Sequence, residues 1–145
     1  MFKHILVPVD GSSTAQLAAE KAIGLAKAFG SRVSTIFVID PYPFTGIGTD
    51  FAYGQTEYLS AATAEANAAI KSIKVVFEQA GVNIQTSVIE SNNAWRGVVE
   101  AAESMQADLI VMGSHGRSGL EKLVLGSVTQ AVLSHTKLPV LVVRG

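Results

Sequence analysis

Two glycine-containing stretches in the last third of the chain have residue types that suit the binding of an anion. Gly113-Ser114-His115-Gly116-Arg117-Ser118-Gly119 follows an apolar run, and Gly126-Ser127-Val128-Thr129 comes shortly after it. Glycines let backbone N–H groups approach a ligand without interference from a side chain. If Ser127 begins a helix, the N–H groups of Val128 and Thr129 have no partner within it and point outward at the positive end of the helix dipole. The two stretches therefore predict a phosphate-binding site at a helix N-terminus.

The same residues also allow a simpler interpretation, in which the glycines only form a turn and Ser127 forms a capping box with Gln130. A serine that caps a helix can serve both roles, because its hydroxyl lies close to where a phosphate would bind. The loop is expected to leave the carboxyl end of a strand, which is where ligands bind in open α/β sheets. From the residues alone, both interpretations stay open.

A Ser–His–Asp hydrolase is a second chemistry that could use these residues, through Asp10, Ser114 and His115. A nucleophile and its base must meet side chain to side chain, whereas the adjacent Ser114 and His115 are expected to point apart. The loop does not have the nucleophile-elbow pattern Gly-x-Ser-x-Gly, and the Gly-Lys-Ser/Thr of a P-loop is missing. Arg117 and Lys122 could supply positive charge for phosphoryl transfer, but no base that would position water is evident. The sequence therefore favours binding over fast catalysis and leaves slow turnover open.

The elements that must position the loop are expected to alternate between strands and helices. Short apolar runs are typical of strands buried on both faces, and one run that alternates apolar with polar residues is typical of an edge strand. The expected strands are Ile5–Val9, Val33–Ile39, Val82–Val88, Leu109–Met112 and Pro139–Val143, and the expected helices start near Ser13, Thr56, Trp95 and Ser127. This alternation predicts a parallel sheet with helices on both faces, and right-handed crossovers restrict it to doubly wound topologies.

Local signals indicate where some of these helices begin and end. Ser13 and Gln16 have the spacing of a capping box, and Gly30 supplies the stop signal of the first helix. Before the long alanine-rich helix expected from about Thr56 lies Tyr42–Gln55, a segment rich in glycine and aromatic residues. A loop of that length in a compact domain is either functional or a mobile insertion, and the sequence does not separate the two.

Composition excludes several classes of protein. The 145 residues suffice for a single domain, Met1–Gly145, and there are no cysteines for disulfides, thiolate metal sites or thiol catalysis. The formal net charge of −1 offers no basic field for nucleic acid or an anionic membrane. The three histidines, His4, His115 and His135, lack the spacing of metal ligands. Because no segment has the length of a membrane helix or the flanks of a signal peptide, we expect a cytoplasmic domain.

Taken together, these motifs resemble those of the universal stress proteins, in the subclass that binds ATP. The resemblance rests on the spacing Gly113-x2-Gly116-x9-Gly126-Ser127, on the opening Ile5–Ser12, on Ala107–Arg117 and on the close Leu138–Val143. It implies an adenine nucleotide alpha hydrolase-like fold, a doubly wound five-stranded parallel sheet of strand order 3-2-1-4-5. It also implies a regulatory module of the stress response with ATP, accompanied by Mg, as its ligand.

The resemblance further implies roles for individual residues. Asp10 would lie beside the ribose and the phosphates, in contact with them directly or through a Mg ion. Pro8 and Val38 would line the adenine, Val38 through its backbone, and Met112 would pack near the base. The residues that would enclose the ribose and phosphates are Gly113, Ser114, His115, Gly116, Arg117, Ser118, Gly119, Gly126, Ser127, Val128 and Thr129. Val38 and Met112 would be apolar in any buried strand, so they add little by themselves.

Two further expectations concern the remaining surface of the molecule. The chain departs from its relatives at Ser91–Arg96, where Trp95 is expected to pack in the core rather than contact a ligand. The apolar last strand, Val140–Val143, is expected at a sheet edge, and the resemblance implies that two copies pair there as a homodimer. The downstream protein partner, the inducing signal and the preference for ATP over AMP are not encoded in any motif. A slow ATPase or phosphotransferase and a non-nucleotide interaction protein remain alternative hypotheses.

Overall fold

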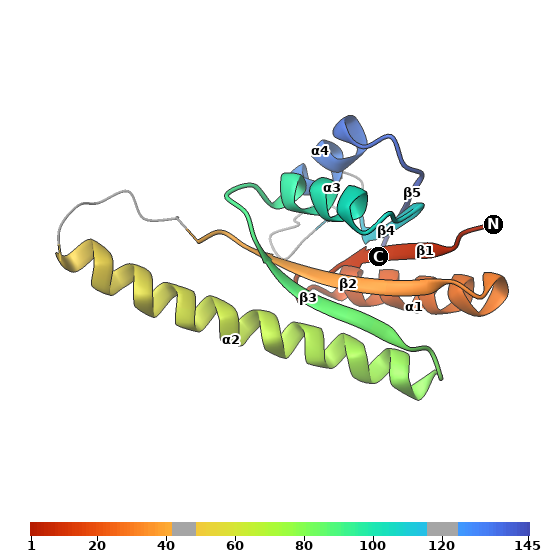
Figure 1. Cartoon of the computed structure of the whole chain (residues 1–145), viewed down its shortest axis with the longest axis horizontal. Helices are drawn as coiled ribbons and strands as arrows, with labels where there is room; N and C mark the ends of the chain where they lie inside the picture. The colour runs from red at the N-terminus through yellow and green to blue at the C-terminus, as the bar shows by residue number, and fades with distance from the viewer. Residues whose placement is uncertain (42–48, 116–124) are drawn as a thin grey trace.

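The structure, a computed structural model, describes residues 1–41, 49–115 and 125–145 of the chain. Five parallel strands form one sheet in the order β3-β2-β1-β4-β5 (Figure 1). The strands are β1 (His4–Pro8), β2 (Arg32–Ile39), β3 (Ile84–Glu90), β4 (Leu109–Gly113) and β5 (Val140–Val143). The expected α/β class and the strand order 3-2-1-4-5 are confirmed.

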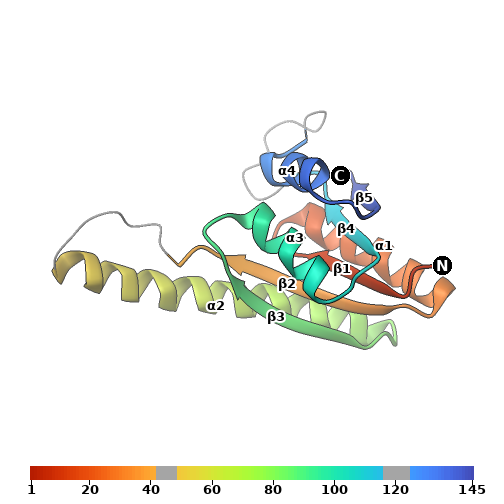
Figure 2. The ribbon, with the colours of Figure 1, turned by 45° about the horizontal axis from the view of Figure 1, so that its top comes forward.

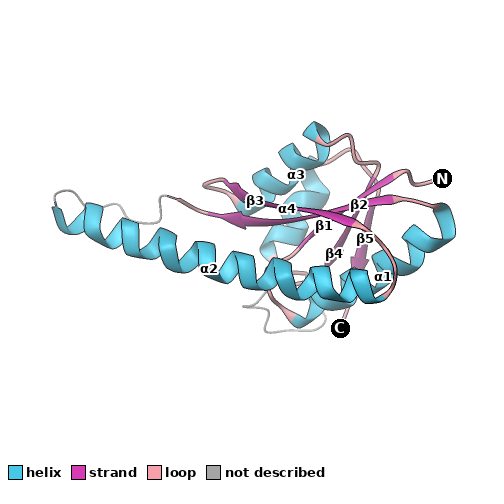
Figure 3. Ribbon diagram, turned by 60° about the horizontal axis from the view of Figure 1, so that its bottom comes forward, coloured by secondary structure: helices cyan, strands magenta, loops and turns pink. Residues whose placement is uncertain are grey.

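Helices cover both faces of this sheet. In the described part of the chain they are α1 (Ser13–Phe29), α2 (Thr49–Gln79), α3 (Ala94–Ser104) and α4 (Ser127–His135). Helices α1 and α2 lie on one face, and α3 and α4 lie on the other (Figures 2 and 3). This arrangement is the doubly wound one that the alternation of elements predicts. None of the helices within the described ranges is both long enough and apolar enough to cross a membrane.

Each face of the sheet carries its own apolar cluster, which explains the continuous apolar runs in the sequence. Ile5 and Val7 of β1 pack with α1 and α2, whereas Leu6 between them packs with α3 and α4 on the opposite face. All three side chains are fully buried, because successive residues of a strand point to opposite faces of a sheet. Strand β3 lies at the edge, and its residues are half-buried or exposed, as its alternating sequence predicts.

The start of α1 differs by one residue from the expected capping box. Ser12, with extended backbone angles of φ −78° and ψ 162°, is the N-cap, and its hydroxyl accepts the Ala15 N–H at 3.2 Å. Ser13 is already the first helical residue, so the predicted box of Ser13 with Gln16 is wrong. The reason lies in the preceding turn, where Asp10 Oδ1 accepts the Ser12 N–H at 2.9 Å and holds Ser12 outside the helix. The expected stop at Gly30 is confirmed, because this residue adopts the left-handed conformation with φ 66°.

Helix α2 begins at Thr49 rather than near Thr56, so part of the segment expected as a loop is helical. The residues numbered 42–48 in Tyr42–Gln55 lie outside the described residues, and those from Thr49 onward are helical. Gly54 lies inside the helix, where a single glycine costs only about 1 kcal/mol relative to alanine and the alanine-rich sequence that follows favours the same conformation. The first turns of α2 extend well beyond the ends of the strands (Figure 1).

Asp108 ties the start of β1 to the start of β4, at the opposite end of the sheet from the glycine-rich loop. Its carboxylate accepts the N–H of Lys3 at 2.9 Å and the N–H of His4 at 3.0 Å. Desolvation acts to raise the pKa of this carboxyl, but the backbone N–H donors outweigh it and hold the pKa below its usual value. The carboxylate form of Asp108 is therefore part of the folded structure.

Candidate functional site

A pocket of about 120 Å³ opens at the carboxyl ends of β1, β2 and β4. β1 and β4 are neighbours, although the chain builds outward from β1 to β2 and β3 before it returns to β4. The pocket therefore lies where the strand order reverses, the position at which open α/β sheets bind their ligands. Its walls come from the β1–α1 turn, the start of α3, the end of β4 and the start of α4.

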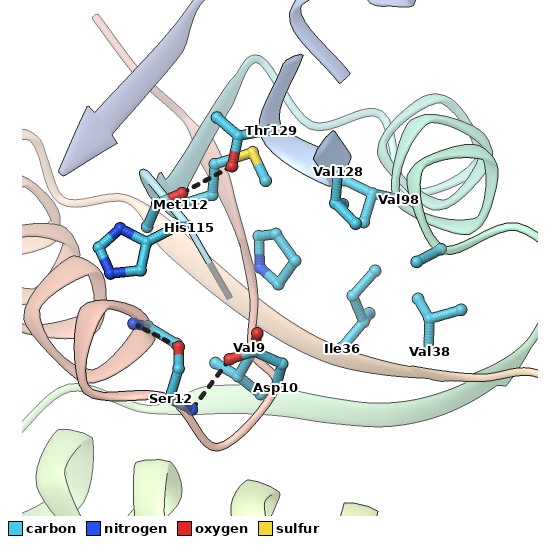
Figure 4. Close-up of a pocket in the computed structure, with 14 residues that line it drawn as sticks. Val9, Asp10, Ser12, Ile36, Val38, Val98, Met112, His115, Val128 and Thr129 are labelled. Atoms are coloured by element: carbon cyan, nitrogen blue, oxygen red, sulfur yellow. Dashed lines mark hydrogen bonds between the residues drawn. The ribbon is translucent and has the colours of Figure 1, made fainter. Parts of the chain in front are cut away.

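The pocket has an apolar end and a polar end, which lie on opposite sides in Figure 4. The apolar end is formed by Ile36, Val38, Val98 and Val128, and the polar end by Asp10, Ser12 and His115. Met112 and Thr129 lie between the two ends. Such a pocket can hold a flat apolar group at one end and a hydroxylated or charged group at the other.

Asp10 is placed at the polar end by the turn that precedes α1. One carboxylate oxygen, Oδ1, accepts the Ser12 N–H, and none of the described residues donates a hydrogen bond to Oδ2. The carboxylate is partly exposed to the pocket. Asp10 can therefore accept a hydrogen bond from a ligand hydroxyl, or bind a cation, without any change in the turn.

The N-terminus of α4 contributes backbone donors to the pocket wall. Gly126 is the N-cap, and the first N–H bonded within the helix is that of Gln130, which donates to the Gly126 carbonyl at 3.0 Å. Among the described residues, none accepts a hydrogen bond from the N–H of Ser127, Val128 or Thr129. These groups are the free donors that a helix start provides for an anion.

Ser127 itself does not have the capping role that the sequence suggests. It is the first helical residue, and the N-cap Gly126 makes no side-chain capping bond. The predicted box with Gln130 is also wrong, because the Gln130 side-chain amide donates to the Leu125 carbonyl at 2.8 Å. The Ser127 side chain is exposed.

Gly113 and Gly126 are glycines for a packing reason that the sequence does not reveal. A Cβ on Gly113 would lie 2.5 Å from Thr14 Oγ1 and 2.9 Å from the Thr14 backbone carbon, so α1 occupies the space that we expected to be left for a ligand. A Cβ on Gly126 would lie 3.0 Å from His115 Cα. The two motif glycines bring β4, α1 and α4 together, and the pocket lies where these elements meet.

The relation between Ser114 and His115 also contradicts the sequence-based expectation. The two side chains do not point apart, because Ser114 Oγ lies 3.1 Å from His115 Nδ1. Ser114 is only 1% exposed and is not among the residues that line the pocket, so a nucleophilic role is not favoured. The carbonyl of His115 accepts a hydrogen bond from the Thr14 hydroxyl, which holds the backbone of His115 in place.

The structure thus brings together some of the predicted site residues and not others. Those that line the pocket are Pro8, Asp10, Val38, Met112, Gly113, His115, Val128 and Thr129. Ser114 is buried behind His115, and Gly126 and Ser127 lie just before the lining residues of α4. The predicted residues Gly116, Arg117, Ser118 and Gly119 lie outside the described residues.

Sequence reasoning missed several lining residues, which are Val9, Ser12, Ala15, Ile36, Ala94 and Val98. A signal existed for Ser12, because it belongs to the same turn as Asp10. Ala94 and Val98 have the i, i+4 spacing of one helix face, but nothing in the sequence indicates that this face borders the pocket.

Trp95 packs against the apolar cluster of α3 and α4, as expected. Its ring stacks on that of His135, with 4.0 Å between the centroids, and the Arg96 guanidinium lies 5.2 Å from its centroid. The stack joins the outer surfaces of the two helices that form the pocket walls. Within the described ranges, no three His, Asp or Glu side chains come together as a metal site.

Comparison with known proteins gives a consistent result over the whole chain. Residues 1–144 match the universal stress protein family. Universal stress protein MJ0531 of Methanocaldococcus jannaschii is 41% identical over 145 residues, which cover 99% of this chain and 83% of that protein. Universal stress protein MJ0577 of the same organism is 30% identical over 156 residues, with coverages of 99% and 96%.

Solved structures agree with this match. Universal stress protein UspA from Lactobacillus plantarum superposes with a TM-score of 0.87 at 26% identity, over 98% of this chain and 97% of that one. The solved structure of MJ0577 has a TM-score of 0.84 at 31% identity, over 99% and 96%. A universal stress protein in complex with cAMP has a TM-score of 0.73 at 25% identity, over 98% and 97%.

Proposed function

The chain belongs to the universal stress protein family, and on that premise we propose that it binds ATP, with Mg, in the pocket at the carboxyl ends of β1, β2 and β4. The observation that carries the proposal is the pocket itself. It gathers Pro8, Asp10, Val38, Met112 and Val128 from separate parts of the chain, and these are residues that the family pattern assigns to one nucleotide.

The apolar end of the pocket suits the adenine base. Ile36 and Val38 form its floor on β2, and Val98 and Val128 line its sides from α3 and α4. Side chains of this kind contribute by removing the two faces of a planar base from water. The solved relative in complex with cAMP, also an adenine nucleotide, supports this assignment.

The polar end suits the ribose and the phosphates. The free N–H groups at the start of α4 and the ring of His115 supply donors for phosphate oxygens, and hydrogen bonds to charged groups contribute about 1.5–3 kcal/mol each. Asp10 has a carboxylate oxygen free of protein partners in the described structure, which suits a ribose hydroxyl or a phosphate-bound Mg ion. After the costs of association, donors of this number are consistent with a dissociation constant in the micromolar range.

The proposed role is regulatory. ATP binding changes the response of a protein partner if that partner distinguishes the ATP-bound from the ATP-free form, since a ligand shifts an equilibrium only by its differential affinity for two states. Catalysis is not part of the proposal, because Ser114, which contacts His115, is buried and does not line the pocket.

Calorimetric titration of nucleotide-stripped protein with Mg-ATP tests the proposal. We expect one ATP per chain, and we expect Ala94→Phe to weaken binding at least about ten-fold, because the exposed Ala94 side chain borders the apolar end and a phenyl ring there occupies the space of the base. Ala64→Phe, at an exposed position of α2 away from the pocket, is the matched control and should bind like the unmodified protein. A folded protein that binds no ATP would disprove the proposal.

A homodimer through β5 is a second proposal. Strand β5 lies at the edge of the sheet, and Leu141 on it is 40% exposed. An apolar edge strand is normally covered or paired, and pairing of two copies across a twofold axis would cover it. Leu141→Lys should convert the dimer into monomers in sedimentation velocity, whereas an unchanged sedimentation coefficient would reject this interface.

A further inference from the structure

We propose that Ser114 is a positioning residue, which sets the tautomer of His115 so that the Nε2–H of the ring donates to a phosphate oxygen of the ligand. The inference rests on the proposed binding of ATP, and it assigns to Ser114 an indirect role in place of the direct contact that the sequence suggests. It follows from the hydrogen bonds that are available to a buried hydroxyl.

The backbone of Ser114 is fixed on both sides. Its N–H donates to the Val143 carbonyl of β5 at 2.8 Å, and its carbonyl accepts the Gly126 N–H at 2.7 Å. The side chain is 1% exposed, so its hydroxyl does not face bulk solvent. The backbone of Ser114 is therefore held by β5 and by the start of α4, and its hydroxyl lies within hydrogen-bond distance of His115 Nδ1.

A buried hydroxyl needs an acceptor for its proton. Among the described residues, the partner of Ser114 Oγ is His115 Nδ1, at 3.1 Å. If the hydroxyl donates to Nδ1, that nitrogen carries no proton, and the single proton of the neutral imidazole lies on Nε2. The opposite tautomer would have Nδ1–H donate to Oγ, which would leave the hydroxyl proton without an acceptor in the described structure.

The ring of His115 is held at the pocket, where its tautomer decides whether Nε2 can donate to a ligand. It lines the polar end of the pocket on the same side as Ser12 (Figure 4), and Nε2 has no hydrogen-bond partner among the described residues. Thr14 holds the His115 carbonyl from α1, and Gly126 lies against the His115 backbone from α4. The ring therefore presents one fixed N–H donor to a phosphate, beside the free N–H groups of α4.

The test compares the unmodified protein with Ser114→Ala in two measurements. In the ligand-free protein, ¹⁵N chemical shifts of the His115 ring should report a proton on Nε2 and none on Nδ1, and in Ser114→Ala they should report a mixture of tautomers. In calorimetry, Ser114→Ala should weaken ATP about two- to ten-fold, because only a fraction of the molecules then presents the Nε2–H donor in the right place, and should leave adenosine unchanged. Ser114→Cys has a weaker donor of similar size, so its ATP affinity should lie between those of the unmodified protein and Ser114→Ala.

Three other results would overturn the inference, the last of them only in its phosphate contact. A proton on Nδ1 in the unmodified protein would contradict it whether or not ATP binds. An equal loss of ATP and adenosine affinity in both Ser114 variants would show a role in packing alone. If the unmodified protein binds neither ligand, the proposed function fails and the phosphate contact fails with it, whereas the ring spectra still decide whether Ser114 orients His115.

Discussion

Gly97, in the middle of α3, provides the sharpest test of how the pocket wall is built. The interior of a helix normally gains about 0.5–1 kcal/mol from alanine in place of glycine. At Gly97, however, an added Cβ would lie 3.0 and 3.1 Å from the two Cγ atoms of Val38 and 3.2 Å from Ser91 Cβ. Val38 lines the apolar end of the pocket, so the close approach of α3 to β2 helps to determine the width of that end.

The expected effect of Gly97→Ala follows from two opposing contributions. Contacts of this length require neighbours to move by a few tenths of an ångström, and overpacking of a core costs about 1–3 kcal/mol. After the gain in helix propensity, we expect a net loss of stability of about 1–2 kcal/mol. Because Val38 must shift toward the pocket or α3 must move away from it, ATP affinity should fall as well.

Gly24, in the middle of α1, is the matched control. It is exposed, and no heavy atom lies within 4 Å of an added Cβ. Gly24→Ala should therefore stabilise the protein by the full helix contribution of about 0.5–1 kcal/mol, with ATP affinity unchanged.

Urea unfolding at equilibrium measures both variants, with the slope m checked for constancy so that midpoints can be compared. The same measurement on Val38→Ala and on the double variant closes a thermodynamic cycle. Without the Cγ atoms of Val38, Gly97→Ala should cost less. If Gly97→Ala stabilises the protein as much as Gly24→Ala does, the tight packing of α3 on Val38 is refuted.

Three other predictions concern single contacts. Asp10→Asn keeps an oxygen that can accept the Ser12 N–H, so it should preserve the fold, weaken Mg-ATP about ten-fold or more, and reduce the difference in affinity between titrations with and without Mg. A Mg dependence equal to that of the unmodified protein would argue against Asp10 as the Mg contact. Gly113→Ala should destabilise the fold by about 3 kcal/mol in urea unfolding, because its Cβ would meet the backbone carbon of Thr14 as well as its side chain; stability equal to that of the unmodified protein would contradict the observed packing. The pKa of Asp108 is lower in the folded protein than in the unfolded chain, so its carboxylate stabilises the folded state at pH values above the pKa of the unfolded chain. This contribution is lost as the pH falls through the pKa of the folded protein. Asp108→Asn should therefore be less stable at neutral pH and lose less stability below about pH 4, as measured by thermal unfolding across that range; parallel pH profiles would argue against the hydrogen bonds to Lys3 and His4.

Much of the fold could be predicted from the sequence, because the signals are local. A continuous apolar run such as Ile5–Val9 requires burial on both faces, and the alternation in Val82–Val88 requires one wetter face; both follow from the two-residue period of a strand. Gly30 ends α1 because glycine adopts the left-handed conformation without strain. The order of strands came from the resemblance to a family, since local pattern determines which segments are strands but not which strands are neighbours.

The candidate site, too, has features that the sequence predicted and features that only the structure shows. The sequence predicted a phosphate-binding loop after the fourth strand, because glycine spacing and a helix start are visible in the chain itself. Only the tertiary structure decided that Thr14 fills the space beside Gly113, that Ala94 and Val98 face the pocket, and that Ser114 turns toward His115. Each of these depends on contacts between segments distant in sequence. The Ser114 side chain turns inward because β5 and α4 hold its backbone on both sides, and no property of the neighbouring residues specifies those partners.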